Sequence, residues 1–317
     1  MRITAFGGGK GLSAGLRALR RAAVDLDLEI TAVVTVGDDG GSSGRLRQHR
    51  EALPPGDLRQ ALAALAGTDE VSARTAELFQ HRYTGCDSDP LVGHAVGNLV
   101  LVGLMELYGD PVCALEHAGR MVNAVGRVLP MSTEPLAIEA DVRGADPTRP
   151  AEVVTVRGQH NVAVTPGRVE QVRLTPPAPA ACAQALAAVA TADWLVFGPG
   201  SWYTSVIPHL LVPDLAAAIV ASPARRLVTL NLAEESETLG LSLADHLAAL
   251  RWYLPGLRLD DVIADGKAVG DPEPVARAAE SLGARLVLAS VGADDGSHRH
   301  DPVALGAALV PVLGSAR

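Results

Sequence analysis

The chain has 317 residues, of which 48% are hydrophobic and 20% are charged, and its formal net charge is -9. This amount of apolar material can form a sizeable core, which excludes a mainly disordered chain. The acidic balance excludes a broad nucleic-acid-binding surface, because affinity for a phosphate backbone depends on clustered lysine and arginine.

Cysteine usage and the length of apolar runs indicate the compartment. The cysteines, Cys86, Cys113 and Cys182, show no C-x-x-C spacing, and an odd number does not suit a disulfide framework. The first residues lack the charged and apolar regions of a signal peptide. Apolar runs such as 99–102 are far shorter than the roughly 20 residues that cross a membrane. We therefore expect a cytoplasmic protein without membrane insertion.

The first third of the chain predicts a β-α-β unit followed by helices. Residues 3–6 predict a short buried strand, and Leu12, Leu16 and Leu19 then repeat at helical spacing. Residues 29–36 predict a second buried strand that ends in a polar loop. Asp57 is expected to cap the next helix, which has leucines at 58, 62 and 65. Further helical patterns cover about 72–81, 94–108 and 111–125.

The middle of the chain departs from this pattern and then returns to it. Residues of about 136–175 predict a β-rich excursion with strand-like runs at 153–156 and 169–174. A helix at about 180–191 and strands at 194–197, 227–230 and 286–291 follow. Alternating strands and helices predict an α/β fold: one Rossmann-like, doubly wound, mostly parallel domain over 1–317.

In such sheets, ligands bind at the carboxyl ends of strands, so the loop after the first strand is the first candidate site. Its residues are Gly8, Gly9, Lys10, Gly11 and Leu12, and Gly9, Gly11 and Ala14 have G-x-G-x-x-G/A spacing. Glycines let backbone N–H groups approach a diphosphate at a helix N-terminus. The alternative is a tight turn without a ligand. The Lys10 side chain either contacts phosphate or faces solvent.

The loop after the second strand is the next candidate. It contains Asp38, Asp39, Gly40, Gly41, Ser42 and Ser43. Asp38 and Asp39 suit a ribose hydroxyl or Mg²⁺, the one cofactor that the residues suggest, and the Gly/Ser backbone suits an anion. Taken alone, the segment would be a surface turn, but its position beside the first loop favours a binding role.

Three other groups complete the candidate site. After the strand at 194–197, phosphate binding and helix capping are equally compatible with Gly198, Gly200, Ser201, Thr204 and Ser205. Asp57 is expected first to cap a helix, and Arg59 is either a surface residue or an anion clamp. His94 and Asn98 are expected on one helix face at i and i+4. The acidic run 234–237 is either a solvated turn or a partner surface.

Several enzyme classes lack support. The sequence contains no H-E-x-x-H, paired C-x-x-C or G-x-S-x-G motif, which excludes the corresponding metalloprotease, zinc-ribbon and hydrolase readings. An NAD-dependent oxidoreductase remains an alternative because of the Gly9, Gly11 and Ala14 spacing. However, Asp38 lies 27 residues beyond Gly11 (38 - 11), rather than about 20.

Six ordered segments give the chain a resemblance to a known family. They are GGGKGL at 7–12, VTVGDDGGSSGRLR at 34–47, PPGDLRQALAALA at 54–66, GHAVGNL at 93–99, GPGSWYTSVIPHLLV at 198–212 and RHD at 299–301. Over nearly its whole length the chain resembles the gluconeogenesis factor family (YvcK-like proteins), relatives of 2-phospho-L-lactate transferase. The resemblance implies a Rossmann-like core, a homodimer and a phosphate site that also includes Asn231.

The resemblance further implies a ligand and a role. The ligand is a phosphorylated nucleotide or a nucleotide sugar such as UDP-N-acetylglucosamine. The implied role is regulatory support of cell shape and envelope synthesis during growth on gluconeogenic carbon, without an assigned reaction. The related transferases imply an alternative: Mg²⁺-dependent phosphotransfer with Asp38, Asp39 and Asp57 around the metal and Lys10 or Arg59 neutralising charge.

The chain departs from the family pattern at expected pocket edges. Lys10 replaces the usual threonine, and residues 234–238 replace a Gln-Pro-Gly-Glu-Thr-like stretch. The helix expected at about 272–282 lacks the family's frequent tyrosine. The resemblance therefore leaves base and sugar specificity open.

Overall fold

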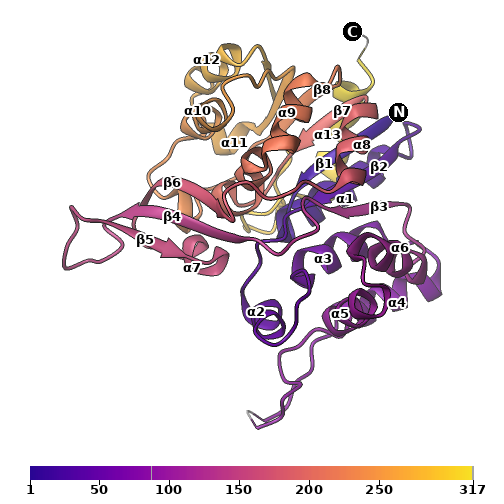
Figure 1. The fold of residues 1–317 in the computed structure, drawn as a ribbon. Coiled ribbons are helices and arrows are strands. Elements are labelled where there is room, and N and C mark those ends of the chain that lie inside the picture. The colour runs from indigo at the N-terminus through magenta and orange to yellow at the C-terminus, as the bar shows by residue number, and fades with distance from the viewer. Residues whose placement is uncertain (87, 316–317) are drawn as a thin grey trace.

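The structure is a computed structural model that describes residues 1–86 and 88–315, and within them a parallel sheet has the strand order β10-β9-β8-β7-β1-β2-β3. Helices cover both faces of this sheet (Figure 1). The arrangement confirms the predicted α/β, doubly wound fold. The strands are β1 (Arg2–Gly7), β2 (Glu29–Val34), β3 (Gly126–Pro130), β7 (Trp194–Phe197), β8 (Arg225–Thr229), β9 (Asp261–Asp265) and β10 (Arg285–Ala289).

The core lies between the central strands and the helices beside them. In β1 and β2 every residue after the first is buried, as expected for strands covered on both faces. Phe6 on β1 and Phe197 on β7 stack with ring centroids 4.8 Å apart. Helix α1 (Gly9–Ala22) packs against α3 (Pro55–Leu65) and α13 (Pro302–Leu313). These contacts fix the first glycine loop relative to the sheet.

The other helical elements either cover the main sheet or, like α4 and α5, pack against other helices. They are α2 (Gly41–Arg47), α4 (Glu70–Gln80), α5 (Val96–Tyr108), α6 (Pro111–Met121), α7 (Gln159–Ala163), α8 (Ala183–Thr191), η1 (Trp202–Val206), η2 (Ile207–Leu211), α9 (Pro213–Ala221), η3 (Ser236–Thr238), α10 (Leu243–Tyr253), α11 (Gly266–Val269) and α12 (Glu273–Ser281). Within the described residues, no single helix has the length and apolarity to cross a membrane; one helix pair bent by 81°, Trp202–Leu211 and Pro213–Ala221, meets these criteria only when combined.

The predicted β-rich excursion is a small antiparallel sheet that projects from the main sheet (Figure 1). It consists of β4 (Ala137–Arg143), β5 (Val153–Arg157) and β6 (Arg168–Thr175), in the order β5-β4-β6. Burial alternates along β4, where Ile138, Ala140 and Val142 form the inner face. The short helix α7 connects β5 to β6 and packs against β4 and η1.

Several expected boundaries were wrong. Helix α2 begins inside the predicted loop 38–44, and α3 begins at Pro55, so Asp57 lies in its first turn instead of capping it. Proline suits this first helical position because its missing N–H would have no helical partner there. The segment after β7 enters the π-helical turn η1 rather than an α-helix. Strands β3 and β4 had not been distinguished from their surroundings.

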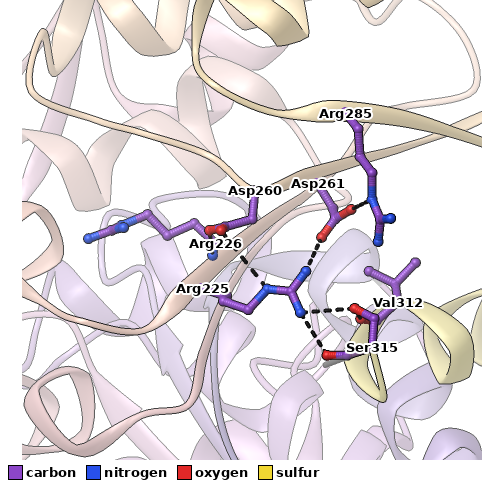
Figure 2. Close-up of polar contacts among 7 residues, drawn as sticks. All are labelled: Arg225, Arg226, Asp260, Asp261, Arg285, Val312 and Ser315. Carbon is purple, nitrogen blue, oxygen red and sulfur yellow. Dashed lines mark hydrogen bonds and ion pairs between the residues drawn. The ribbon is translucent and has the colours of Figure 1, made fainter. Parts of the chain in front are cut away.

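An ion cluster around the buried carboxylate of Asp261 joins the amino ends of three parallel strands (Figure 2). Arg225 Nη2 donates to Asp261 Oδ2 at 2.9 Å, and Arg285 also pairs with this fully buried carboxylate. Arg225 Nη1 donates to the Ser315 carbonyl at 2.9 Å. Its guanidinium also lies 4.1 Å from the centroid of the Trp194 ring. The cluster therefore stabilises the sheet at the edge opposite the glycine loops.

Candidate functional site

The candidate site lies where the strand order reverses, between the carboxyl ends of β1 and β7. From these neighbours the chain continues outward through β2 on one side and β8 on the other. Such switch points leave a crevice in doubly wound sheets because successive connections diverge. The glycine loops that follow β1 and β7 meet there. A Cβ added to Gly11 would lie 2.3 Å from Gly200 Cα and 2.4 Å from the Pro199 carbonyl oxygen.

Asn231, which follows β8, holds the glycine loop after β7 in place. Its Oδ1 accepts from the Gly200 N–H at 3.0 Å, and its Nδ2 donates to the Gly200 carbonyl at 3.0 Å. The residue is buried. Its amide therefore has a clear positioning role in addition to the predicted place in the site.

A cavity of about 750 Å³ lies over the two loops. It brings together part of the predicted set: Gly8, Gly9, Lys10, Gly11, Gly200, Ser201, Ser205 and Asn231. Other lining residues had not been included: Arg17, Gln60, Gln80, Leu232, Ala233, Glu234, Glu235, Ala293, His298, Arg299, His300, Asp301 and Pro302. Two signals could have found some of them. Arg17 follows Lys10 by two helical turns, and the RHD motif had been noted without a role.

Other predicted residues support the loops from behind. Leu12 is a core residue, and its N–H donates to the Gly8 carbonyl at 3.2 Å. Thr204 is buried in η1, and its carbonyl accepts from Gln159 Nε2 at 2.9 Å. Gly198 has a φ of 73° and lies against the Thr229 carbonyl, where an added Cβ would be 2.8 Å from the oxygen. These residues do not border the cavity.

Asp38 and Asp39 point in different directions. Asp39 Oδ1 accepts from the His160 N–H at 2.9 Å, which links the loop after β2 to α7. The neighbouring Gly158 has a φ of 94°, and a Cβ there would lie 2.1 Å from Asp39 Oδ2. Asp38 Oδ1 instead accepts from the Gly40 N–H at 3.0 Å. The two adjacent carboxylates thus accept hydrogen bonds from different elements.

Asp57 lies directly beneath the first glycine loop. A Cβ added to Gly8 would be 2.5 Å from Asp57 Oδ2, and the Gly9 N–H donates to this carboxyl group. Burial, followed by the charge of Asp38, raises the pKa of Asp57 well above its usual range. Asp38 and Asp57, rather than Asp38 and Asp39, are therefore the carboxylates that interact beside the loop.

The remaining predicted side chains form a buried hydrogen-bonded chain. Arg59 Nη1 donates to Asn98 Oδ1 at 3.0 Å, Asn98 Nδ2 donates to Ser42 Oγ at 2.9 Å, and Ser42 Oγ is 2.9 Å from His94 Nδ1. Helix α5 begins at Val96, so His94 and Asn98 do not share a helix face; Ser42 joins them.

Two members of this hydrogen-bonded chain, His94 and Arg59, have lowered pKa values. Burial, then the charges of Arg45 and Arg82, lower the pKa of His94. Burial, then the Arg82 charge, lower the pKa of Arg59 to about 10. Ser43 Oγ accepts from the Gly56 N–H at 3.0 Å and thereby connects α2 to the start of α3. Ser42 and Ser43 are thus both used within the protein, and neither borders the cavity.

The acidic run 234–237 is divided between cavity and core. Glu234 and Glu235 border the cavity, whereas Glu237 is buried. The Tyr203 N–H donates to Glu237 Oε1 at 2.8 Å, and burial raises the pKa of Glu237 to about 7. The expectation of a wholly solvated turn or partner surface was therefore wrong for Glu237, which anchors η3 to η1.

Over residues 1–86 and 88–315, no group of three or more His, Cys, Asp or Glu side chains is arranged to hold a metal. Asp38 and Asp57 could supply two carboxylates, with ligand phosphate oxygens completing a Mg²⁺ shell. The Mg²⁺ site at Asp38 and Asp39 stays a prediction.

Fold and site together define a doubly wound α/β protein with a glycine-lined cavity at the switch point of its sheet. The sequence model of "2-phospho-L-lactate transferase CofD" matches residues 3–288. The chain therefore belongs to the CofD family, and the relatives below place it among the gluconeogenesis factors within it.

Known relatives agree over most of the chain. A Mycobacterium tuberculosis protein provisionally named a gluconeogenesis factor is 49% identical over 311 residues, which cover 97% of this chain and 89% of that protein. The Bacillus subtilis gluconeogenesis factor is 34% identical over 287 residues, 90% of this chain and 84% of that one. A solved UPF0052 family protein from Bacillus halodurans has a TM-score of 0.83 and 32% identity, with 98% of each chain covered.

Proposed function

We propose that the cavity binds a phosphorylated nucleotide-type ligand, specifically a nucleotide sugar of the UDP-N-acetylglucosamine type. The observation that carries this proposal is the contact between the two glycine loops at the floor of an approximately 750 Å³ cavity. The loops present backbone at a helix N-terminus, which favours phosphate oxygens. The volume lies within the range of about 300–1,000 Å³ that small-molecule sites occupy.

Cations on α1 support an anionic ligand beside the first glycine loop. Lys10 and Arg17 border the cavity from this helix, whereas the carboxylates that border it, Glu234, Glu235 and Asp301, belong to other segments. The relatives' name supports a role as a gluconeogenesis factor. We propose that this role is regulatory, is exercised in the cytoplasm, and supports cell shape and envelope synthesis during gluconeogenic growth.

Isothermal titration tests the ligand directly. The protein is titrated with UDP-N-acetylglucosamine, GDP, NAD and inorganic phosphate in separate experiments. We expect saturable binding of the UDP-sugar and weaker binding of the other three. Preference for NAD would favour the oxidoreductase alternative, and binding of none of the four would overturn the proposal.

A second candidate is Mg²⁺-dependent phosphotransfer of the 2-phospho-L-lactate transferase type, favoured by the interaction between Asp38 and Asp57 and by the family match. Bound Mg²⁺ would neutralise charge that develops on the transferring phosphate. Arg59 acts electrostatically on Asp57 from behind the loop. Incubation with Mg²⁺, a guanosine diphosphate donor and a deazaflavin acceptor tests this candidate, and absence of turnover counts against it.

A homodimer, which the family resemblance implies, is also part of the proposal. Size-exclusion chromatography with light scattering separates the monomer mass from twice that mass. A single species at the monomer mass across a wide concentration range would contradict dimerisation.

A further inference from the structure

Helix α4 has a wider apolar face than its neighbours cover. Ser72 and Phe79 are buried where the helix packs against α3 and α5. Val71 and Leu78, each one position earlier, are 75% and 52% exposed beside an open groove of about 540 Å³. The residues that line this groove, the outer face of α4, are Glu70, Val71, Arg74, Thr75, Glu77, Leu78 and His81. Apolar side chains gathered on one helix face in this way indicate an interaction surface.

The apolar row of this outer face is complementary to a second copy of itself. Val71, Thr75 and Leu78 have i, i+4, i+7 spacing and therefore lie in one row along the helix. Val71 lies four residues before Thr75, and Leu78 lies three residues after it. If two such helices run antiparallel about a two-fold axis at Thr75, each valine meets the leucine of the other copy within one residue, or about 1.5 Å, along the helix.

The charges of the outer face are complementary about the same axis. Glu70, Arg74, Glu77 and His81 form a second row at i, i+4, i+7, i+11, along one flank of the apolar row. Arg74 lies one residue before Thr75 and Glu77 two residues after it, while Glu70 lies five before and His81 six after. In an antiparallel pair about a two-fold axis the same flanks meet, so each acidic residue comes level with a basic one within one residue.

The charged groups can turn toward a second copy at little cost. Arg74 Nη1 lies 2.7 Å from Glu77 Oε2 within one chain, and both side chains are largely exposed. An exposed ion pair of this kind contributes little to stability, so its members can exchange partners.

We infer that α4 pairs antiparallel with α4 of a second copy of this chain, with Val71 against Leu78 on either side of a two-fold axis at Thr75. This inference rests on the homodimer of the proposed function and assigns its interface. One helix of 11 residues per chain is a small interface beside the roughly 1,600 Å² that standard interfaces bury. We therefore expect a reversible dimer whose population rises with protein concentration.

Pairing through this face leaves the ligand cavity open. Gln80, through which α4 borders the cavity, lies nine residues beyond Val71 and therefore half a turn from it around the helix. Substitutions on the outer face are thus expected to change assembly without changing the affinity for UDP-N-acetylglucosamine.

A substitution at the axis tests the interface. Thr75→Arg brings two arginines together in the pair and is expected to weaken dimerisation by at least about tenfold at low salt. Thr191→Arg on α8 is the matched control, since each threonine Oγ1 donates to the carbonyl four residues earlier, that of Val71 or of Ala187. Light scattering over a series of protein concentrations measures the mass of both variants and of the wild type.

A pair of charge variants tests the antiparallel register. Arg74→Glu leaves acidic residues at both 74 and 77, and Glu77→Arg leaves basic residues at both, so each variant repels its own copy. We expect each to dimerise about fivefold more weakly than the wild type. An equimolar mixture places acid against base at both positions, and we expect it to form heterodimers that native mass spectrometry detects and added salt weakens.

The outcomes separate the interface from the rest of the proposed function. If the wild type is a dimer and Thr75→Arg associates as strongly as Thr191→Arg, the inference is overturned and the homodimer has another interface. Absence of heterodimers in the mixture overturns the antiparallel pairing. A wild type that stays monomeric at every concentration contradicts both the inference and the homodimer. Failure of a dimeric wild type to bind UDP-N-acetylglucosamine contradicts the proposed ligand alone.

Discussion

At the scale of single residues, the glycines of the first loop have unequal roles. Gly9 has a φ of 59°, which favours glycine by conformation, whereas Gly11 is required by space. Its neighbours within reach are backbone atoms of Pro199 and Gly200 in the loop after β7, and these cannot move as a side chain could. The sequence motif alone does not distinguish the two reasons, because Gly200 lies almost 190 residues away.

We expect Gly11→Ala to lower the free energy of unfolding by about 2–4 kcal/mol, since it forces two backbone segments apart. It should also weaken binding of UDP-N-acetylglucosamine by separating the loops. Urea unfolding and titration measure the two effects. Gly103→Ala is the control. This exposed glycine within α5 has no neighbour near an added Cβ, so alanine should raise the free energy of unfolding by up to about 1 kcal/mol. Wild-type stability of Gly11→Ala would contradict the contact between the loops.

Glu237 predicts a pH dependence of stability. Burial raises its pKa from 4.5 to about 7, so the folded state holds a proton that the unfolded state releases. This contribution is complete below about pH 4.5 and is lost as pH rises to about 7, a change of about 3 kcal/mol. We therefore expect the stability of Glu237→Gln, measured relative to wild type by urea unfolding, to increase over this range. Parallel curves for the two proteins would show that Glu237 does not titrate as inferred.

At the scale of elements, the strands were easier to predict than their partners. The runs at 3–6, 29–36 and 194–197 are short and apolar, and local pattern suffices to indicate them. The ion cluster of Figure 2 depends instead on which strands become neighbours, since Arg225, Asp261 and Arg285 begin three separate strands. Their sequence separation hides the pairing.

Asp261→Asn should lower the free energy of unfolding by about 3 kcal/mol, because it removes the buried negative charge and leaves the largely buried guanidinium of Arg225 without its main partner. Glu273→Gln is a matched control, since it breaks an exposed pair with Arg277 on α12 and should cost less than about 0.5 kcal/mol. Chemical unfolding measures both variants. Equal effects would mean that burial of the Asp261 cluster contributes nothing.

In the loop after β2, contact with α7 gives Asp39 a structural role that its sequence position did not indicate. Asp39 accepts a hydrogen bond from α7, so Asp39→Ala should lower the free energy of unfolding by about 1–2 kcal/mol. Because the carboxylate is turned toward α7, titration should show less than about a twofold change in UDP-sugar affinity, far below the cost of losing a charge-assisted contact. A loss of affinity larger than tenfold would support the sequence-based placement of Asp39 in the binding site.

At the scale of the whole molecule, ligand binding and folding are coupled. A ligand present at about 100 times its Kd stabilises the folded state by about 2.7 kcal/mol, which corresponds to an increase in Tm of about 4 °C for a chain of this length. We expect this shift with UDP-N-acetylglucosamine in a thermal scan. Gly11→Ala at the same ligand concentration should show a smaller shift, and no shift in the wild type would contradict the proposed ligand.

The sequence by itself determined the α/β class, the doubly wound sheet with its β-rich excursion, and the glycine loops after the first and seventh strands, because periodicity and glycine content are local properties. Only the tertiary structure decided which candidates meet. It brought Gly11 against Gly200, turned Asp39 to α7 while Asp57 moved beneath the loop, and placed Arg17, Gln60 and Gln80 along the cavity. Helix packing and strand order set these neighbours, and both depend on contacts between residues far apart in the chain.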